Sequence, residues 1–269
     1  MSKNVKELSA SGVKKYKDCP KSFWYKYLSD IEPPEKEEPE HFKVGNAVHD
    51  SLENFLLRDN PILSDNESIF EELQKEEDYL DYDYDDNDKV DNCFQTASRW
   101  ISSFINEVHH VEEEWEMNRD GIRYRGMSDL VAEMVMDGTV FDEVIVDWKT
   151  GSENSEWKEK IQGGMYLEMY YDKFGSYPDA VVFVYLDEET QSMHSRIDGG
   201  EVFWNEQENK YWTKIQKYKS KIINSDNSGE WEANPDQSRC YFCDYKHHCI
   251  DSGIGAEEVT KEHIEFGGL

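Results

Sequence analysis

The sequence lacks any long apolar run. Its 269 residues contain no stretch near the roughly 18 apolar residues that a helix needs to span a bilayer. The first residues, MSKNVKELSASG, have no apolar core of the kind found in secretory signal peptides. No segment repeats at a fixed period, which excludes solenoid folds. We therefore expect a soluble protein of the cytoplasm that has no membrane partner.

Positive charge is scarce as well. The chain has 29 Lys and Arg against 59 Asp and Glu, for a formal net charge of −30. Such an excess makes a chain repel itself, whereas in molar salt the Debye length falls to about 3 Å and the repulsion is screened. A halophilic archaeon or its virus is therefore the expected source. The alternative is an ordinary protein whose acidic residues lie in surface loops, and the ratio of 22 Lys to 7 Arg is unexpected for an extreme halophile.

The distribution of charged residues and of sequence motifs along the chain predicts four segments. Aromatic residues make up 13% of the chain, which argues against wholesale disorder. One segment, RDNPILSDNESIFEELQKEEDYLDYDYDDNDKVDN, is so acidic that it indicates an insertion with a surface loop at DYDYDDND. Its rival interpretation is a DNA-mimicking or calcium-binding segment, although the spacing of an EF-hand loop is absent. The segments are an N-terminal helical part (1–57), the acidic insertion (58–92), a core (93–225) and a C-terminal cysteine segment (226–269).

Hydrophobic periodicity predicts a mixed α and β fold. Ser9 or Ser11 can cap a first helix. Apolar residues recur with a helical period in several further stretches, and elsewhere the period changes to two, as in half-buried strands. The expected helices cover 44–57, 94–108, about 155–174 and 209–221, and the expected strands cover 111–118, 122–135, 139–150 and 180–186.

A carboxylate and an amine end one of these strands. In VIVDWKTG, Asp147 and Lys149 are two residues apart and so share one face of the strand, while Trp148 points the other way into packing. Asp129, in GMSDLVAEM, lies on a strand that can pair with the first. Two carboxylates brought together repel each other unless a cation lies between them. The pattern therefore predicts a site for Mg²⁺ or Mn²⁺, which prefer oxygen ligands.

Two expected helices carry further candidates for this site. Gln162 and Tyr166 are one helical turn apart and share a face. His49 lies on a helix, four residues before Glu53. A lone histidine is more often structural than a metal ligand, so His49 carries weight only together with the other residues.

The order of these motifs resembles a known family. S-x-x-x-x-Y-x-x-CP-x-x-F, VGNAVH, G-x-x-D, DWKTG and Q-x-x-x-Y follow one another between about residues 8 and 250. This is similar to the RecB-like branch of the PD-(D/E)xK nuclease superfamily, which implies a restriction-endonuclease-like core with a central mixed sheet flanked by helices. The resemblance makes Lys149 the catalytic lysine and puts Gln162 and Tyr166 close to the active site and the DNA. The implied metal ligands are His49, Asp129, Asp147 and the backbone carbonyl of Trp148.

The cysteines indicate a second metal centre. Three of them stand in RCYFCDYKHHCI with the spacing C-x₂-C-x₅-C, namely Cys240, Cys243 and Cys249. Cys19 is the best candidate for a fourth ligand, and Cys93 is expected to be a small core residue. Spacing alone leaves open Zn²⁺, which could recruit His247 or His248, or a [4Fe–4S] cluster. The resemblance favours the [4Fe–4S] cluster, with a structural role that joins the N- and C-terminal segments.

The resemblance also implies an activity. We expect a divalent-metal-dependent DNA exonuclease that acts on single-stranded DNA or duplex ends in CRISPR adaptation, recombination or repair, with a CRISPR integrase or recombination proteins as candidate partners. Two lysine-rich segments, 14–26 and 210–221, are expected to contact the phosphates, although a solvated helix face is an equal alternative. The other candidate function is a non-catalytic DNA-end-binding or scaffold protein that retains the fold.

Overall fold

The computed structural model divides the chain into two compact units. The cysteine unit comprises Met1–Lys36, Asn118–Tyr124 and Thr213–Leu269, and the sheet unit comprises Glu37–Met117 and Arg125–Trp212. Within these bounds the structure describes residues 4–35, 38–80, 82–151, 156–187, 190–195, 197–198, 201–202, 209–235 and 237–251. Residues 252–269 of the predicted cysteine segment lie outside the described residues.

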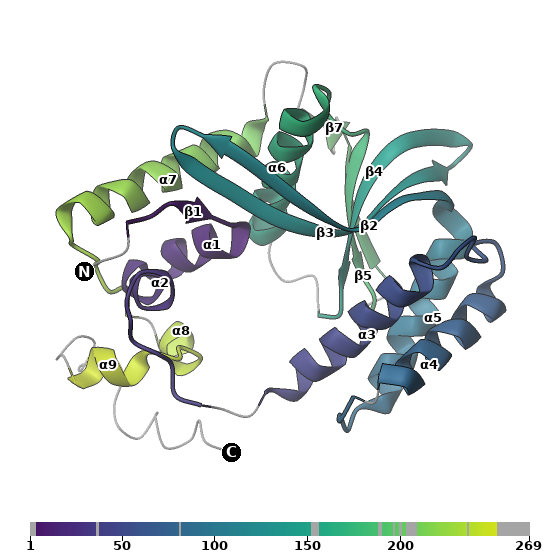
Figure 1. Cartoon of the computed structure of the whole chain (residues 1–269), viewed down its shortest axis with the longest axis horizontal. Coiled ribbons are helices and arrows are strands. Elements are labelled where there is room, and N and C mark those ends of the chain that lie inside the picture. Colours follow the sequence, from purple (N-terminus) through teal and green to yellow (C-terminus); the bar gives the residue numbers. More distant parts are fainter. Residues whose placement is uncertain are drawn as a thin grey trace. The chain divides into compact units, whose positions relative to one another are not determined.

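A mixed β-sheet is the framework of the sheet unit (Figure 1). The strand order is β1-β3-β4-β5-β6, and β2 pairs with β3 off this path. β3 and β4 are antiparallel, β4 and β5 parallel, and β5 and β6 antiparallel. This confirms the predicted central mixed sheet. The strands are β2 (Ile105–Arg119), β3 (Ile122–Met136), β4 (Thr139–Lys149), β5 (Ala180–Tyr185) and β6 (Thr190–Ser195), with a separate short pair, β7 (Ile197–Asp198) and β8 (Glu201–Val202).

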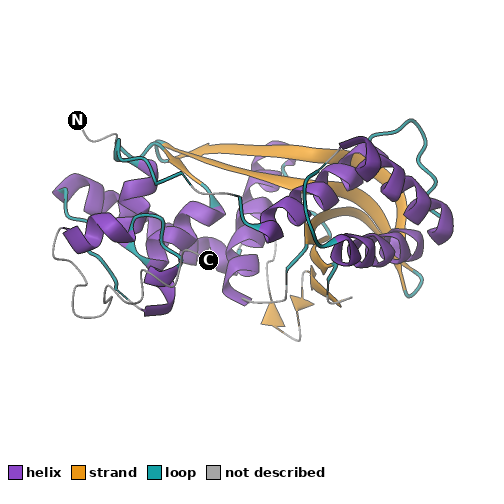
Figure 2. Ribbon diagram, turned by 90° about the horizontal axis from the view of Figure 1, so that it is seen from below, coloured by secondary structure: helices purple, strands orange, loops and turns teal. Residues whose placement is uncertain are grey.

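Tight turns join the first three long strands, which Figure 2 shows in orange. Asp137 and Gly138 have φ angles of 50° and 77° between β3 and β4. Asp120 and Gly121 have φ angles of 53° and 76° between β2 and β3. Two left-handed residues in a row match the twist of antiparallel strands, and Asp-Gly is a favoured pair for this turn. The sequence DG at 137–138 therefore predicts its hairpin correctly.

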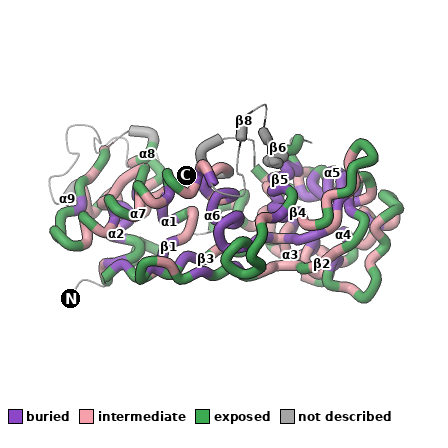
Figure 3. Tube along the Cα trace, turned by 90° about the horizontal axis from the view of Figure 1, so that it is seen from above, coloured by how far each residue is buried: buried purple, intermediate pink, exposed green. Residues whose placement is uncertain are grey.

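Helices cover both faces of the sheet. Three of them pack on one face, α3 (Glu40–Leu56), α4 (Asn66–Leu80) and α5 (Asn87–Phe104), and their apolar residues form a core with alternate residues of β3, β4 and β5. Val146 and Trp148 face this core, whereas Ile145 and Asp147 alternate with them. The other face meets α6 (Glu156–Phe174), where a Cβ at Gly163 would lie 3.6 Å from Phe183. Figure 3 shows the buried stretches of β4, β5 and α6. The helix-flanked sheet of the predicted fold class is thus present.

Local sequence explains where these helices begin and what they bury. Asp86 caps α5 by accepting a hydrogen bond from the backbone N–H of Lys89 at 3.2 Å. Ile69 and Leu73 are fully buried on α4, the helix within the acidic stretch. The helix predicted over 94–108 ends earlier, at Phe104, because residues from Ile105 onward are part of β2.

The cysteine unit is built from short elements around aromatic side chains. β1 (Glu7–Leu8) pairs in parallel with Arg123 and Tyr124 of β3. Ser9 caps α1, as expected, by accepting a hydrogen bond from Gly12 N–H. Phe23 stacks on Trp231, with ring centroids 5.7 Å apart, and Tyr16 packs edge-on against both rings. The helices are α1 (Ala10–Asp18), α2 (Pro20–Tyr27), the part of α7 (Lys210–Ser228) from Thr213 on, α8 (Gln237–Tyr241) and α9 (Lys246–Asp251).

In the part of the chain that the structure describes, no helix combines the length and the apolar character needed to cross a bilayer. The four predicted segments, with boundaries at 57, 92 and 225, remain a prediction. The acidic stretch at 58–92 contains α4 and the first turn of α5, and the side chain of Tyr82 within it donates a hydrogen bond to Asp50.

Candidate active site

The end of β4 carries an acid and an amine side by side. Asp147 and Lys149 share one face of the strand, and the Lys149 ammonium contacts the Asp147 carboxylate directly. The Asp147 residue is 3% exposed, so its charge is almost entirely removed from water. Trp148 faces the opposite side, where its ring packs edge-on against Trp100 at 5.2 Å. The strand period therefore separates the packing residue from the two polar ones, as the sequence predicts.

Two side chains of α6 fix the buried carboxylate. Gln162 donates from Nε2 to Asp147 Oδ2 at 2.6 Å, and the Tyr166 hydroxyl donates to the same oxygen at 2.8 Å. Lys149 Nζ also lies 3.5 Å from Gln162 Oε1. Gln162 and Tyr166 thus face the site together, one helical turn apart, and hold Asp147 in one orientation.

Asp129 of β3 and His49 of α3 complete the arrangement. Asp129 accepts a hydrogen bond from the backbone N–H of Trp148 at 2.5 Å, which ties β3 to β4 at this point. Its other oxygen lies 3.3 Å from His49 Nδ1. The structure thus brings the six predicted side chains of the site together. The contact of Asp129 is with the backbone N–H of Trp148, and the carbonyl of Trp148 stays a predicted metal ligand.

Two glycines of the predicted motifs allow the helices to come this close. A Cβ at Gly45 of α3 would lie 3.3 Å from the Thr150 hydroxyl, just beyond Lys149. A Cβ at Gly126 of β3 would lie 3.1 Å from Met169 and 3.2 Å from Tyr166 on α6. Both distances are tighter than most real Cβ contacts, so larger residues would push α3 and α6 outward.

Glu112 is a member of the site that the sequence did not single out. Ligand atoms of His49, Glu112 and Asp129 all lie within 4.8 Å of one another. Glu112 stands in the run Glu112–Glu114 of β2, where nothing in the sequence distinguishes one glutamate from the next. Its φ of 50° is left-handed, and no pattern of apolar residues reveals such a break within a strand.

Burial and crowding of negative charge shift the proton affinities here. Burial raises the pKa of Asp147, the Lys149 ammonium opposes that rise, and the Asp129 carboxylate adds to it. Burial together with the charges of Asp129 and Glu53 raises the pKa of Glu112 to about 7. Burial alone would lower the pKa of His49, but its hydrogen bond to Asp129 and the neighbouring carboxylates outweigh that effect and raise it.

The donor set fits a hard divalent cation. The His49, Glu112 and Asp129 triad supplies one nitrogen and two carboxylate oxygens, and Asp147 adds a nearby buried carboxylate. Oxygen-rich sites of this kind suit Mg²⁺ or Mn²⁺, and the histidine makes Mn²⁺ equally acceptable. A cation between these carboxylates would also remove their mutual repulsion, which raises the pKa of both Glu112 and Asp147.

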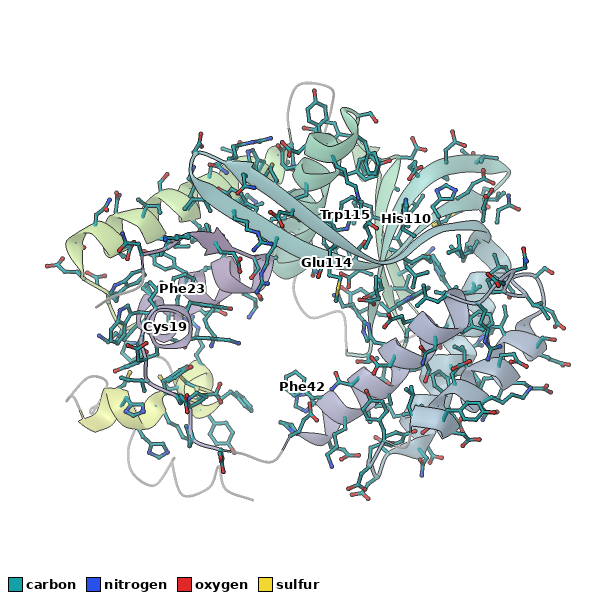
Figure 4. All side chains as sticks on the ribbon, viewed as in Figure 1. Cys19, Phe23, Phe42, His110, Glu114 and Trp115 are labelled. Carbon is teal, nitrogen blue, oxygen red and sulfur yellow. The ribbon has the colours of Figure 1, made fainter. Side chains whose placement is uncertain are left out.

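The four predicted cysteine ligands come together in the cysteine unit. None of the four forms a disulfide and each is partly exposed, in contrast to Cys93, which is fully buried on α5 as expected. Burial raises the pKa of Cys249 to about 11, and the neighbouring thiols of Cys243, Cys19 and Cys240 contribute to that rise. Figure 4 labels Cys19 and Phe23 in this unit.

Backbone and side-chain contacts join the segments that carry these cysteines. Lys21 N–H donates to the carbonyl of Glu232 at 3.0 Å, and Asn234 N–H lies 3.4 Å from Cys19 Sγ. Tyr25 stacks on Tyr245 with ring centroids 5.2 Å apart. The N-terminal cysteine and the C-terminal three therefore converge although more than 200 positions separate them along the chain.

Comparison with known proteins agrees with this fold. The sequence matches the PD-(D/E)XK nuclease superfamily over residues 7–250, and the chain belongs to that superfamily. Nucleases of this superfamily use divalent metals and act on DNA. Compared with the curated proteins, the sequence matches none.

Solved structures give the same fold. A crystal structure of a presumed exonuclease from Eubacterium rectale matches with a TM-score of 0.54 and 15% sequence identity, covering 90% of this chain and 88% of that one. A crystal structure of a protein named SSO0001 matches with a TM-score of 0.40 and 12% identity, covering 96% of this chain and 89% of that one. The second likeness is too weak to support a conclusion about this chain.

Proposed function

We propose that this protein is a divalent-metal-dependent DNA exonuclease of the RecB-like branch, with the site around Asp147 as its active site. The observation that carries the proposal is the pairing of Lys149 with the buried Asp147 carboxylate, beside Asp129 and His49. A structural ion pair alone does not need a second carboxylate and a histidine beside it. The likeness to a presumed exonuclease from Eubacterium rectale supports the choice of exonuclease.

Each side chain has a separate task in this proposal. His49, Asp129 and Asp147, with the Trp148 carbonyl, hold Mg²⁺ or Mn²⁺. When bound, such an ion polarises a phosphate and lowers the pKa of a coordinated water. Lys149 carries a positive charge beside the scissile phosphate and stabilises the negative charge that develops on its oxygens.

Gln162 and Tyr166 act by holding other groups. Their hydrogen bonds to Asp147 keep its carboxylate in place when Lys149 turns toward the substrate. The Tyr166 hydroxyl also lies within hydrogen-bond distance of the Met127 carbonyl and shares its single proton between that carbonyl and Asp147, so it also ties α6 to β3. These two residues are therefore positioning residues for the carboxylate, close to the expected DNA path.

DNA is held in part by aromatic and basic residues of the cysteine unit. Phe242 is 79% exposed and Tyr241 is 40% exposed, which leaves their rings available for stacking on bases. Lys21 Nζ lies 4.5 Å from the Trp24 ring centre. The basic segments 14–26 and 210–221 supply phosphate contacts, although Lys14 and Lys219 already pair with Asp18 and Asp120. Stacking therefore carries a larger share of the binding in high salt.

The proposal is tested by the topology of the substrate. Linear DNA labelled at its ends and covalently closed circular DNA are incubated with the full chain and Mn²⁺ or Mg²⁺. We expect nucleotides to be released from the linear DNA only, and EDTA or Asp147→Ala to abolish the release. Equal cleavage by Asp147→Ala would refute the site, and DNA binding without cleavage would favour a non-catalytic end-binding protein.

We also propose that Cys19, Cys240, Cys243 and Cys249 hold a structural [4Fe–4S] cluster. Four thiolates are the usual ligand set for such a cluster. A single zinc ion with Zn–S bonds of about 2.3 Å would bring its thiolates within roughly 4 Å of one another. The same four thiolates are also a ligand set for zinc, and the resemblance of the sequence motifs to iron–sulfur nucleases is what favours the cluster.

Metal analysis decides between the two occupants. Protein purified without oxygen is assayed for iron, acid-labile sulfide and zinc. We expect about four irons and four sulfides per chain. One zinc per chain without sulfide would assign the four cysteines to zinc instead.

The biological setting is proposed at the level of the reaction class. An enzyme that trims DNA ends serves CRISPR adaptation, recombination or repair, with an integrase or recombination proteins as partners. The net charge of −30 supports a halophilic archaeon or its virus as the source. Neighbouring integrase genes would support CRISPR adaptation, and neighbouring replication or packaging genes would support a virus.

A further inference from the structure

The side chain of Glu112 does not lie on the side of β2 that a regular strand would give it. Trp115 and Met117 of β2 are each 1% exposed, while Glu114 and Glu116 alternate with them on the exposed side. Figure 4 labels Glu114 and Trp115 on this strand. In an unbroken strand Glu112 would share the exposed side with Glu114 and Glu116, because side chains two residues apart point the same way.

The backbone at Glu112 breaks this alternation. Its φ of 50° is left-handed, a conformation that residues other than glycine rarely adopt and that is unfavourable for glutamate. Irregularities of this kind in strands redirect side chains and occur next to active sites. The result here is that the Glu112 carboxylate lies within 4.8 Å of ligand atoms of both His49 and Asp129.

The surroundings of Glu112 hold too much negative charge for a carboxylate without a cation. Asp129, Glu53 and Asp147 all interact unfavourably with the Glu112 charge. Within the described residues no hydrogen bond or ion pair holds its carboxylate, whereas Asp129 accepts from Trp148 N–H and Asp147 contacts Lys149. Glu112 therefore brings to the cluster a carboxylate within 4.8 Å of ligand atoms of His49 and Asp129.

We propose that Glu112 is a further direct ligand of the active-site divalent cation, in addition to the His49, Asp129 and Asp147 ligands of the proposed site. This inference rests on the proposed function, because it concerns the same metal site. It accounts for both unfavourable features of Glu112, since a bound cation offsets the left-handed backbone and the crowded charge together.

Binding of Mn²⁺ to the full chain, measured by calorimetry or by electron paramagnetic resonance, tests the assignment without any substrate. We expect Glu112→Gln to weaken Mn²⁺ binding at least about tenfold, the loss typical when even an outer partner of a metal site is removed. The matched control is Glu114→Gln, which makes the same change on an exposed neighbour of the same strand and should leave affinity unchanged. His49→Ala is the positive control and should weaken binding as well.

Unchanged affinity in Glu112→Gln, together with weaker binding in His49→Ala, would overturn the role of Glu112 and leave the metal site intact. A wild-type chain that binds no Mn²⁺ would overturn the proposed function along with it. Circular dichroism shows whether each variant is folded. If Glu112→Gln is not, Glu112→Asn provides the same test, because asparagine tolerates a left-handed backbone.

Discussion

The carboxylates of the sheet unit and the thiols of the cysteine unit are held in place by different means. Asp129 and Asp147 stand on strands of 15 and 11 residues, and Gln162 and Tyr166 on a helix of 19 residues, all packed into the main core. Cys240 and Cys249 stand on helices of only 5 and 6 residues. Among residues 239–249, whose burial the structure describes, only Tyr245 is buried.

This difference indicates which of the two centres has its geometry before its metal is bound. The carboxylate site is held by packing and by hydrogen bonds between its own members, so metal-free protein should keep its geometry. Residues 239–249, which carry three cysteines, bury little apolar surface in the described structure, and helices of this length are marginal without tertiary packing. Ligands that link Cys19 to this end restrict the unfolded chain and stabilise the folded one.

Removal of a carboxylate should have the largest effect on activity and a small effect on the fold. We expect Asp129→Asn to lower the rate of DNA hydrolysis at least about 10³-fold, because it removes charge from the ligand set and from the transition state. The fold should persist, since the asparagine oxygen can still accept from Trp148 N–H. Asp142→Asn makes the same change at an exposed position on β4 and should keep the activity. Unfolding of Asp129→Asn in circular dichroism would contradict a site held by packing.

Removal of a thiol should have the opposite pattern, with a larger effect on the fold than on activity. We expect Cys249→Ala to lose the bound iron and to make residues 230–251 sensitive to protease, with a loss of stability of about 2 kcal/mol or more. Cys93→Ala is the matched control. Cys93 lies in the core of the sheet unit, where burial raises the pKa of its thiol to about 12. That variant should keep its iron and lose about 1–2 kcal/mol through the small cavity.

A smaller effect on activity is expected from removal of the Tyr166 hydroxyl, which holds Asp147. Tyr166→Phe removes the donor to Asp147 and to the Met127 carbonyl but keeps the ring. The rate should fall roughly tenfold, and stability should fall by about 1–2 kcal/mol because the buried Asp147 carboxylate loses a donor. Tyr171→Phe, on the exposed side of α6, provides the control. A wild-type rate in Tyr166→Phe would show that the hydroxyl does not position Asp147.

A change in salt concentration should have the smallest effect. The excess of acidic charge predicts that thermal stability rises as KCl increases from 0.1 M to 2 M, since the Debye length falls from about 10 Å to below 3 Å. The buried Lys149–Asp147 pair is screened little, so the ion pair should survive. Lower stability in 2 M KCl, measured by differential scanning calorimetry, would count against an adaptation to high salt.

Much of the fold and the site follows from local sequence patterns. The period of two in VIVDWKTG puts Asp147 and Lys149 on one face and Trp148 on the other, as the structure has them. The helical spacing of Gln162 and Tyr166 gives their shared face in the same way. These relations depend on neighbours within a few residues, which is why the sequence contains them.

No sequence pattern indicates the break in strand β2 at Glu112. A left-handed glutamate within a strand arises from tertiary constraints, and three consecutive glutamates offer no pattern to mark it. The end of α5 is a second example, because residues from Ile105 to Val108 fit a helical period but pair as a strand with β3. At the end of α5, pairing with β3 overrides the local preference for a helix.

The proposed catalytic role of Lys149 is tested most directly by a variant that separates the hydrolysis of DNA from the binding of the metal. Lys149 is not a ligand in this account, so Lys149→Met should bind Mn²⁺ as tightly as the wild-type chain and release no nucleotides from end-labelled linear DNA. Hydrolysis by Lys149→Met at the wild-type rate would contradict the account.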